Sequence, residues 1–143
     1  MTVRRRLSLY GLSVLIGGSG LLHLLMPAPY RRIVPAPLSS WRAEVVIVSG
    51  LAEIVCACLL LLPRTRRLGA IATVVLLVAV FPANLQMALD GGYSDAGFPA
   101  NSAAAAWLRL PLQLPLILWA LSFRLQPETE KASHLEATGR GRG

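Results

Sequence analysis

Five polar side chains stand inside long apolar runs of this sequence, and their chemical types could together bind a polar group. They are His23, Glu53, Asn84, Arg109 and Gln113. A guanidinium and a carboxylate can pair with each other or with opposite charges on a ligand, while imidazole and amide groups donate and accept hydrogen bonds. Arg109 and Gln113 are four residues apart, as are Ser49 and Glu53, so each pair would share one helix face. We therefore expect a polar pocket built from several helices.

These residues do not form a recognisable catalytic, metal or haem motif. The sequence contains no metal-ligand cluster, no Gly-rich phosphate loop and no Ser–His–Asp arrangement. Cys56 and Cys58 would project about 200° apart on a helix, which prevents a disulfide between them. Of the two histidines, only His23 lies in an apolar run, and His134 is near the polar C-terminus. We therefore expect no metal site and no intrinsic catalysis.

The composition places the chain among membrane proteins. Hydrophobic residues make up 55% of the 143 residues, charged residues only 15%, and the mean hydropathy is +0.58. The net charge of +7 would also suit a nucleic-acid-binding protein. However, the basic residues stand at the ends of apolar runs rather than in a stripe interleaved with aromatic residues. A lipid bilayer with anionic headgroups is therefore the expected partner, and not nucleic acid.

Four apolar runs predict the fold. They span residues 7–26, 43–62, 68–89 and 104–123. Each has about 20 residues, enough for a helix to cross a hydrocarbon core of about 30 Å. We expect an all-α, four-helix transmembrane bundle that forms one domain over residues 1–125. Residues 126–143 are polar and without apolar periodicity, which predicts a disordered cytoplasmic tail.

The distribution of lysine and arginine predicts the orientation. With the N-terminus inside, the cytoplasmic side would hold Arg4, Arg5, Arg6, Arg64, Arg66, Arg67, Arg124, Lys131, Arg140 and Arg142. The other side would hold only Arg31, Arg32 and Arg42. This asymmetry predicts a multi-pass membrane protein with both termini in the cytoplasm. The alternative, a cleaved signal peptide over the first run, is disfavoured because that run is long and lacks a cleavage site.

In this orientation, the five polar residues fall at or above the membrane midplane, in the outer half of the bundle. The nine Leu, Ile and Phe residues of the fourth run contribute roughly 3–5 kcal/mol of insertion free energy, and one central arginine costs about 2.5–3.5 kcal/mol. Arg109 should therefore face the bundle, opposite Glu53. Two interpretations of this pair stay open: a structural ion pair that fixes helix register, and a ligand site.

Glycines and prolines in the runs predict close packing and kinks. The stretch GLSVLIGGSG is rich in small residues, which let helix backbones approach each other. Pro82, Pro111 and Pro115 each remove one helical hydrogen bond and leave a carbonyl without its donor. Such carbonyls must be satisfied by neighbours or water, so we expect kinks that face a small polar cavity.

The segments GLLHLLMPAPYRRIVPAP, SGLAEIVCACLLLLPRTRRLGA, VFPANLQMAL and RLPLQLPLILWA resemble the DoxX-like family of small bacterial membrane proteins. The resemblance covers residues 20–120, and the blocks follow in the same order. Its pattern falls on His23, Pro27, Tyr30, Pro35, Glu53, Pro82, Asn84, Arg109, Pro111 and Gln113. Leu24 departs from the pattern, because an aromatic residue usually follows the histidine.

The resemblance implies a four-helix bundle in the bacterial inner membrane. It also implies a link to membrane redox chemistry, because the family name comes from a subunit linked to thiosulfate:quinone oxidoreduction. We therefore expect a non-catalytic or accessory subunit of a quinone-linked system, with quinone as the cofactor and a membrane redox protein as the partner. The alternative is a binding or transport bundle for a small polar or anionic solute, with Arg109 as the anchor.

Overall fold

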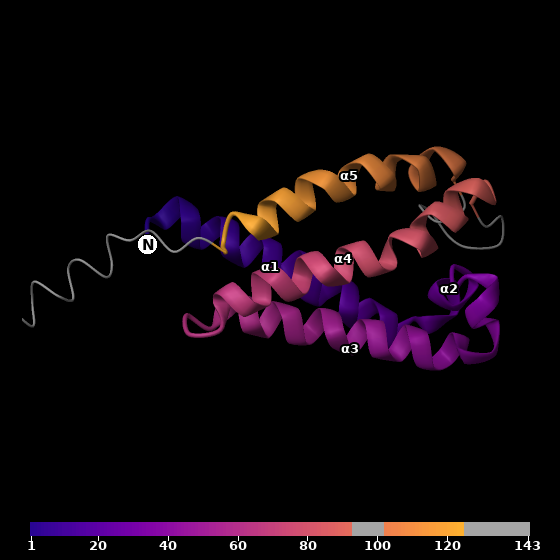
Figure 1. Cartoon of the computed structure of the whole chain (residues 1–143), viewed down its shortest axis with the longest axis horizontal. Helices are drawn as coiled ribbons and strands as arrows, with labels where there is room; N and C mark the ends of the chain where they lie inside the picture. The colour runs from indigo at the N-terminus through magenta and orange to yellow at the C-terminus, as the bar shows by residue number, and fades with distance from the viewer. Residues whose placement is uncertain (93–101, 125–143) are drawn as a thin grey trace, which may run out of the picture.

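The computed structural model describes residues 1–92 and 102–124, and this part of the chain is almost entirely helical (Figure 1). Its elements are α1 (Val3–Leu25), α2 (Pro27–Arg32), the 3-10 helix η1 (Ala36–Trp41), α3 (Arg42–Leu61), α4 (Arg66–Leu89) and α5 (Ala103–Leu121). No strand occurs in these two ranges. The predicted all-α, four-helix fold is confirmed. The tail predicted at 126–143 lies outside the described residues.

The four long helices follow the four apolar runs, with differences at their ends. α1 begins at Val3, ahead of the run, because the Thr2 hydroxyl accepts a hydrogen bond from the Arg5 backbone N–H at 3.4 Å and caps the helix. The connection from α1 to α3 contains the two short helices α2 and η1. Pro27 starts α2 and Pro35 precedes η1, positions where the missing N–H of proline costs nothing.

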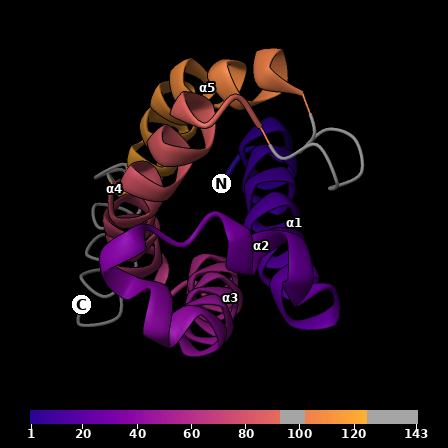
Figure 2. The same ribbon diagram turned by 90° about the vertical axis from the view of Figure 1, so that its right-hand side faces the viewer.

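The long helices surround a common centre in the order α1, α3, α4 and α5 (Figure 2). α1 packs along α3, and α4 lies between α3 and α5. The N-terminus, the α3–α4 turn and the end of α5 gather at one end of the bundle, and α2 lies at the other (Figure 1). In the rest of the text these are called the N-terminal end and the α2 end.

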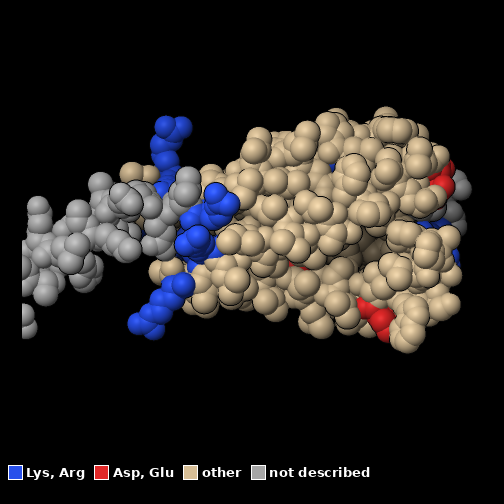
Figure 3. Space-filling view, in the orientation of Figure 1, with Lys and Arg blue, Asp and Glu red and all other residues tan. Residues whose placement is uncertain are grey.

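The surface has the charge distribution of a membrane-spanning protein. On the face shown in Figure 3, a broad band of almost entirely uncharged residues separates the N-terminal end, where several basic side chains lie, from the α2 end, where acidic and basic residues are visible. Leucine and valine side chains in this band are strongly exposed, for example Val14 at 74% and Leu118 at 67%. All four long helices are long and apolar enough to cross a membrane. The chain is therefore an integral, multi-pass membrane protein, with its apolar side chains facing lipid.

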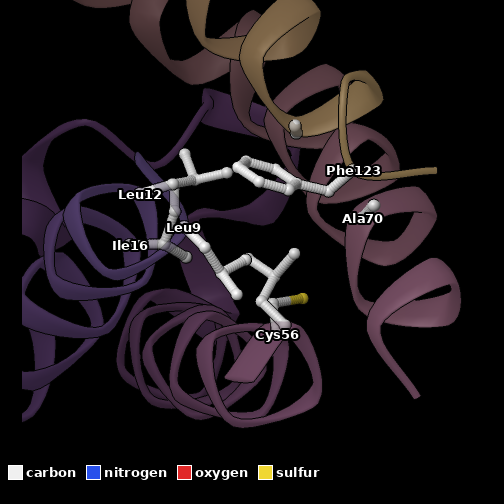
Figure 4. Close-up of a cluster of buried hydrophobic side chains, with 8 residues drawn as sticks. Leu9, Leu12, Ile16, Cys56, Ala70 and Phe123 are labelled. Atoms are coloured by element: carbon white, nitrogen blue, oxygen red, sulfur yellow. The ribbon is translucent and has the colours of Figure 1, made fainter. Parts of the chain in front are cut away.

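An apolar cluster closes the N-terminal end of the bundle (Figure 4). It consists of Leu9, Leu12, Ile16, Cys56, Leu60, Ala70, Ala120 and Phe123. The Trp119 indole N–H donates to the Ser8 hydroxyl at 2.7 Å, and Arg5 donates to the Ser122 carbonyl at 3.2 Å, so α1 and α5 meet here. Towards the α2 end, a smaller cluster of Met87, Ala88 and Ala106 joins α4 to α5. The two clusters leave the middle of the bundle to other side chains.

α1 and α3 touch through their backbones, as the small residues of the first run predicted. A Cβ atom on Gly20 would lie 2.5 Å from the Gly50 carbonyl oxygen and 2.8 Å from the Glu53 Cβ. A Cβ atom on Gly50 would lie 2.8 Å from the Cβ of His23. Neither position has room for a side chain. Gly18, on the same helix as Gly20, has nothing within 4 Å of its Cβ position.

Alanine substitutions at Gly20 and Gly18 of α1 should distinguish the effect of lost helix packing on stability from the effect of helix propensity. We expect Gly20→Ala to lower the free energy of unfolding by about 1–3 kcal/mol, because the added methyl pushes α1 away from α3. Gly18→Ala, the matched control, should leave stability unchanged or raise it by up to about 1 kcal/mol. Unfolding of both variants in detergent micelles measures this. Equal destabilisation by both would contradict the close contact.

Candidate functional site

A cavity of about 510 Å³ lies in the middle of the bundle, lined by all four long helices and by the α2–η1 segment. Four of the five predicted site residues line it: His23, Glu53, Asn84 and Arg109. Most of the remaining lining is apolar, including Ile16, Val46, Val80 and Leu116. The cavity therefore combines a few polar groups with an apolar wall, a composition typical of small-molecule sites.

His23 occupies the last turn of α1 and is held in one orientation. Its Nδ1 lies 2.8 Å from the Ser19 carbonyl oxygen. Because a carbonyl can only accept, Nδ1 carries a proton and donates it to this bond. The ring also stacks on Tyr30 of α2, with the ring centroids 3.8 Å apart. The imidazole is thus fixed on two sides.

Glu53 is buried on α3 beside His23, and its carboxyl group is incompletely satisfied. The His23 Nδ1 is 3.4 Å from Glu53 Oε2, within ion-pair distance. However, the proton on Nδ1 is already directed at Ser19, and Oε2 has no hydrogen-bond partner among the described residues. A buried acceptor left in this state costs about 1–3 kcal/mol.

Arg109 does not form the expected contact with Glu53. Its Nη1 instead lies 3.3 Å from the thioether sulfur of Met87, which is a weak acceptor. In residues 1–92 and 102–124, no carboxylate lies within ion-pair distance of the guanidinium. Both charged side chains nevertheless line the same cavity. The structure therefore places Glu53 and Arg109 at two positions on one cavity wall rather than in a direct pair.

Gln113 is separated from the other four predicted residues. It is buried on α5, and its side-chain amide donates to the Leu77 carbonyl of α4. This carbonyl is adjacent to that of Val78, which Pro82 leaves without a helical donor. Gln113 is not among the residues that line the cavity, but it bonds to Leu77, which does line it. Its role in the structure is that of an interhelical bond.

Three polar residues that line the cavity, Ser19, Tyr30 and Ser49, were outside the five predicted site residues. Ser19 lies one helical turn before His23 and orients it through a backbone carbonyl. Tyr30 lies in the connection after α1, between the first two apolar runs, and the search for polar residues inside those runs did not include it. The signal was present in the resemblance, because Pro27 and Tyr30 belong to its pattern. Pro27 starts the short helix that places Tyr30 over His23.

Tyr30 is close enough to Glu53 and Arg109 for their charges to change the pKa of its phenol. Burial raises the pKa of its phenol above the ordinary value of 10.0, the charge of Glu53 raises it further, and Arg109 lowers it. At neutral pH the phenol is therefore protonated and supplies a hydroxyl at the wall of the cavity. Since the folded protein holds this proton more tightly than the unfolded chain, the contribution of Tyr30 to stability falls as the pH rises above 10.0.

Comparison with known proteins gives one match. A family model described as a domain of unknown function, DUF8561, matches residues 12–124. No curated protein and no solved structure matches the chain. The matched range includes every residue that lines the cavity.

The ionisation of Tyr30 offers a test of the cavity geometry. We expect Glu53→Gln to lower the pKa of the phenol towards its ordinary value, because the nearby negative charge is removed. Glu44→Gln, which removes an exposed charge from the same helix, should leave this pKa unchanged. Ultraviolet absorbance of the phenolate, taken as the difference from Tyr30→Phe, measures both. An equal change in the two variants would contradict the proximity of Glu53 to Tyr30.

Proposed function

Since the chain belongs to the family defined by the domain of unknown function DUF8561, we propose a function from its cavity and from its resemblance to DoxX-like proteins. The protein is a non-catalytic, quinone-contacting subunit of a membrane redox system. Its cavity holds the polar head of the quinone inside the bilayer. The observation that carries this proposal is the presence of Glu53 and Arg109, unpaired with each other, on the wall of one largely apolar cavity.

The apolar wall supports a ligand that dissolves in the membrane. The cavity volume of about 510 Å³ lies in the range typical of small-molecule sites, about 300–1,000 Å³. A small hydrophilic solute would gain nothing from the contacts with Ile16, Val46 and Val80. A quinone uses both parts of the site, because its ring and isoprenoid tail are apolar and its two ring oxygens are polar.

The charge of the cavity supports a neutral head group over an anion. Glu53 and Arg109 contribute opposite charges, so the pair adds no net charge when both are ionised. An anion held by Arg109 would also experience repulsion from the Glu53 carboxylate. A neutral head with hydrogen-bonding oxygens experiences no such conflict. This argument ranks the quinone above the anionic solute.

The chain's own residues would bind and orient the ligand. Arg109 and Asn84 can donate to a ring oxygen from α5 and α4, and His23 and Tyr30 line the side nearer α1. The quinone itself would carry electrons and protons, and a partner protein in the same membrane would exchange them with it.

A second candidate function remains supported by one observation. Among the described residues, the Arg109 guanidinium contacts only the Met87 thioether, a weak acceptor, and Arg109 lines the cavity, so its other N–H donors are left for a ligand. Such a guanidinium could anchor a small polar or anionic solute. In this case the protein is a binding or transport bundle.

We further propose that the protein lies in the bacterial inner membrane with its N-terminal end in the cytoplasm. The arginines of that end, Arg4, Arg5, Arg6, Arg64, Arg66, Arg67 and Arg124, support this orientation through the positive-inside rule. It would place His23, Asn84 and Arg109 in the outer half of the membrane.

Reporter fusions test the orientation. A fluorescent protein fused after residue 143 should be bright and alkaline phosphatase at the same point inactive, because the C-terminus is expected in the cytoplasm. Alkaline phosphatase inserted between residues 92 and 102 is the control and should be active. The opposite pattern would reverse the topology and place the cavity in the inner half.

Ligand binding to purified protein tests the function. We expect decylubiquinone to bind the protein in detergent, and Arg109→Met to weaken binding by about tenfold or more, because a charge-assisted hydrogen bond is lost. Arg67→Met, which removes an exposed arginine at the other end of the bundle, should bind as the unmodified protein does. Titration calorimetry gives the dissociation constants.

Two results would count against the quinone. The first is an absence of binding to folded protein. The second is stabilisation by sulfate or thiosulfate that disappears in Arg109→Met, in the absence of any effect of decylubiquinone. The second result would favour the solute-binding alternative.

A further inference from the structure

The cavity in the middle of the bundle reaches the lipid-facing surface between α3 and α4. Its opening there is marked by residues that line the cavity and are also exposed, namely Leu38 of η1 and Ala79 and Pro82 of α4. Resting on the proposed quinone site, we infer that the isoprenoid tail of the ligand leaves the cavity through this α3–α4 opening. The opening then connects the head-group site to the bilayer in which the ligand dissolves.

α3 and α4 are in close contact at one end and diverge towards the other (Figure 1). At their turn, a Cβ atom on Gly69 of α4 would lie 2.6 Å from the Leu60 backbone nitrogen of α3, so the two backbones touch. Near the α2 end, Met87 of α4 instead packs with Ala106 of α5. The half of α4 nearer the α2 end therefore leaves α3, and the α3–α4 opening lies in this half.

Two residues of α4 leave room at the α3–α4 opening. Ala79 carries only a methyl group, and Pro82 lies three residues later on the same helix face. A proline inside a helix removes one hydrogen bond and favours a bend. The side chain of Val78, beside Ala79, is 56% exposed, so the opening lies within the apolar band that faces lipid. The face shown in Figure 3 is hollowed beside α4, towards the α2 end.

The walls of the α3–α4 opening are apolar, and the polar groups of the cavity lie on other helices. Leu38 and Val45 supply the wall on the side of η1 and α3. The Ser49 hydroxyl donates to a carbonyl of its own helix at 3.1 Å, so its proton is already used. His23 and Arg109 belong to α1 and α5, which lie across the bundle from this opening (Figure 2). The polar head would therefore lie towards α1 and α5, and the tail towards α3 and α4.

The size of the cavity supports a tail that extends outside it. A volume of about 510 Å³ suits a ligand of drug size, whereas a natural quinone carries several isoprenoid units on its ring. An apolar tail that ended in water would lose the favourable free energy of burial. At the α3–α4 opening, the tail passes directly from the apolar walls to the acyl chains of the bilayer. The occupant of the opening is therefore the tail of the bound ligand.

Filling the opening with a large side chain tests this inference. We expect Ala79→Trp to weaken the binding of decylubiquinone to the purified protein by about tenfold or more, because the indole takes the place of the decyl tail. Ala104→Trp is the matched control at an exposed position of α5 that does not line the cavity, and it should bind as the unmodified protein does. Titration calorimetry in one detergent gives the three dissociation constants, so partition of the ligand into micelles is the same for each.

The outcomes separate this inference from the proposed function. Unchanged affinity of folded Ala79→Trp, or equal weakening by Ala104→Trp, would overturn the position of the tail and leave the proposed quinone site intact. Absence of decylubiquinone binding to the unmodified protein would overturn the proposed function itself.

A photoreactive probe locates the tail without any variant, and it decides the inference if Ala79→Trp does not fold. The probe carries the ubiquinone head group and a decyl tail with a diazirine in its middle. After illumination of the unmodified protein, peptide mass spectrometry should find adducts at residues 38–45 and 79–82, and excess decylubiquinone should prevent them. Adducts at Leu15, the exposed lining residue of α1, in place of these would overturn the inference. Adducts that excess decylubiquinone does not prevent would also contradict it.

Discussion

The contact between the backbones of α1 and α3 at Gly20 and Gly50 determines the geometry of the whole site. In lipid, apolar side chains gain little from leaving the solvent, so helices associate through close van der Waals packing at small residues. His23 and Glu53 each lie three residues after one of these glycines, about one helical turn. The close approach therefore places their side chains within 3.4 Å of each other. A side chain at either glycine would separate the helices and remove the pair.

The rest of the bundle keeps space for the cavity by packing its apolar side chains elsewhere. Leu12, Leu60 and Phe123 seal the N-terminal end, where α1 and α5 also meet through Trp119. Met87 and Ala106 join α4 to α5 near the α2 end. Between them, the polar side chains of α1, α3, α4 and α5 face one volume rather than lipid. Tyr30 of α2 lies over His23 at the edge of this volume. The apolar clusters are thus the reason that buried charge can be kept in the middle of the bundle.

The sequence was sufficient for the helices, but not for the direction in which each side chain points. The length of an apolar run determines a span, and the position of a residue in that run determines its depth. The rotation of each helix depends on contacts with its neighbours. Gly20 is buried against α3 while Gly18 faces open space, although both belong to the same small-residue stretch. Gln113 shares a helix face with Arg109 by spacing, yet it bonds to the Leu77 carbonyl of α4 and does not line the cavity. The contact of Arg109 with Met87 likewise depends on the rotation of α5 about its own axis, which the position of Arg109 along the run does not determine.

The separation of Glu53 from Arg109 bears on the choice that the sequence left open, between a structural ion pair and a ligand site. An ion pair that serves stability needs direct contact and good geometry, since each buried charge loses its hydration. Here the two charges do not contact each other in the described part of the chain: Glu53 lies 3.4 Å from His23 with its Oε2 accepting no hydrogen bond, and Arg109 contacts a thioether. Two poorly satisfied groups of opposite sign on one cavity wall cost stability in the free protein. A ligand that fits both removes this cost, and the gain appears as affinity. The arrangement therefore favours a binding role for these two residues over a role in helix register.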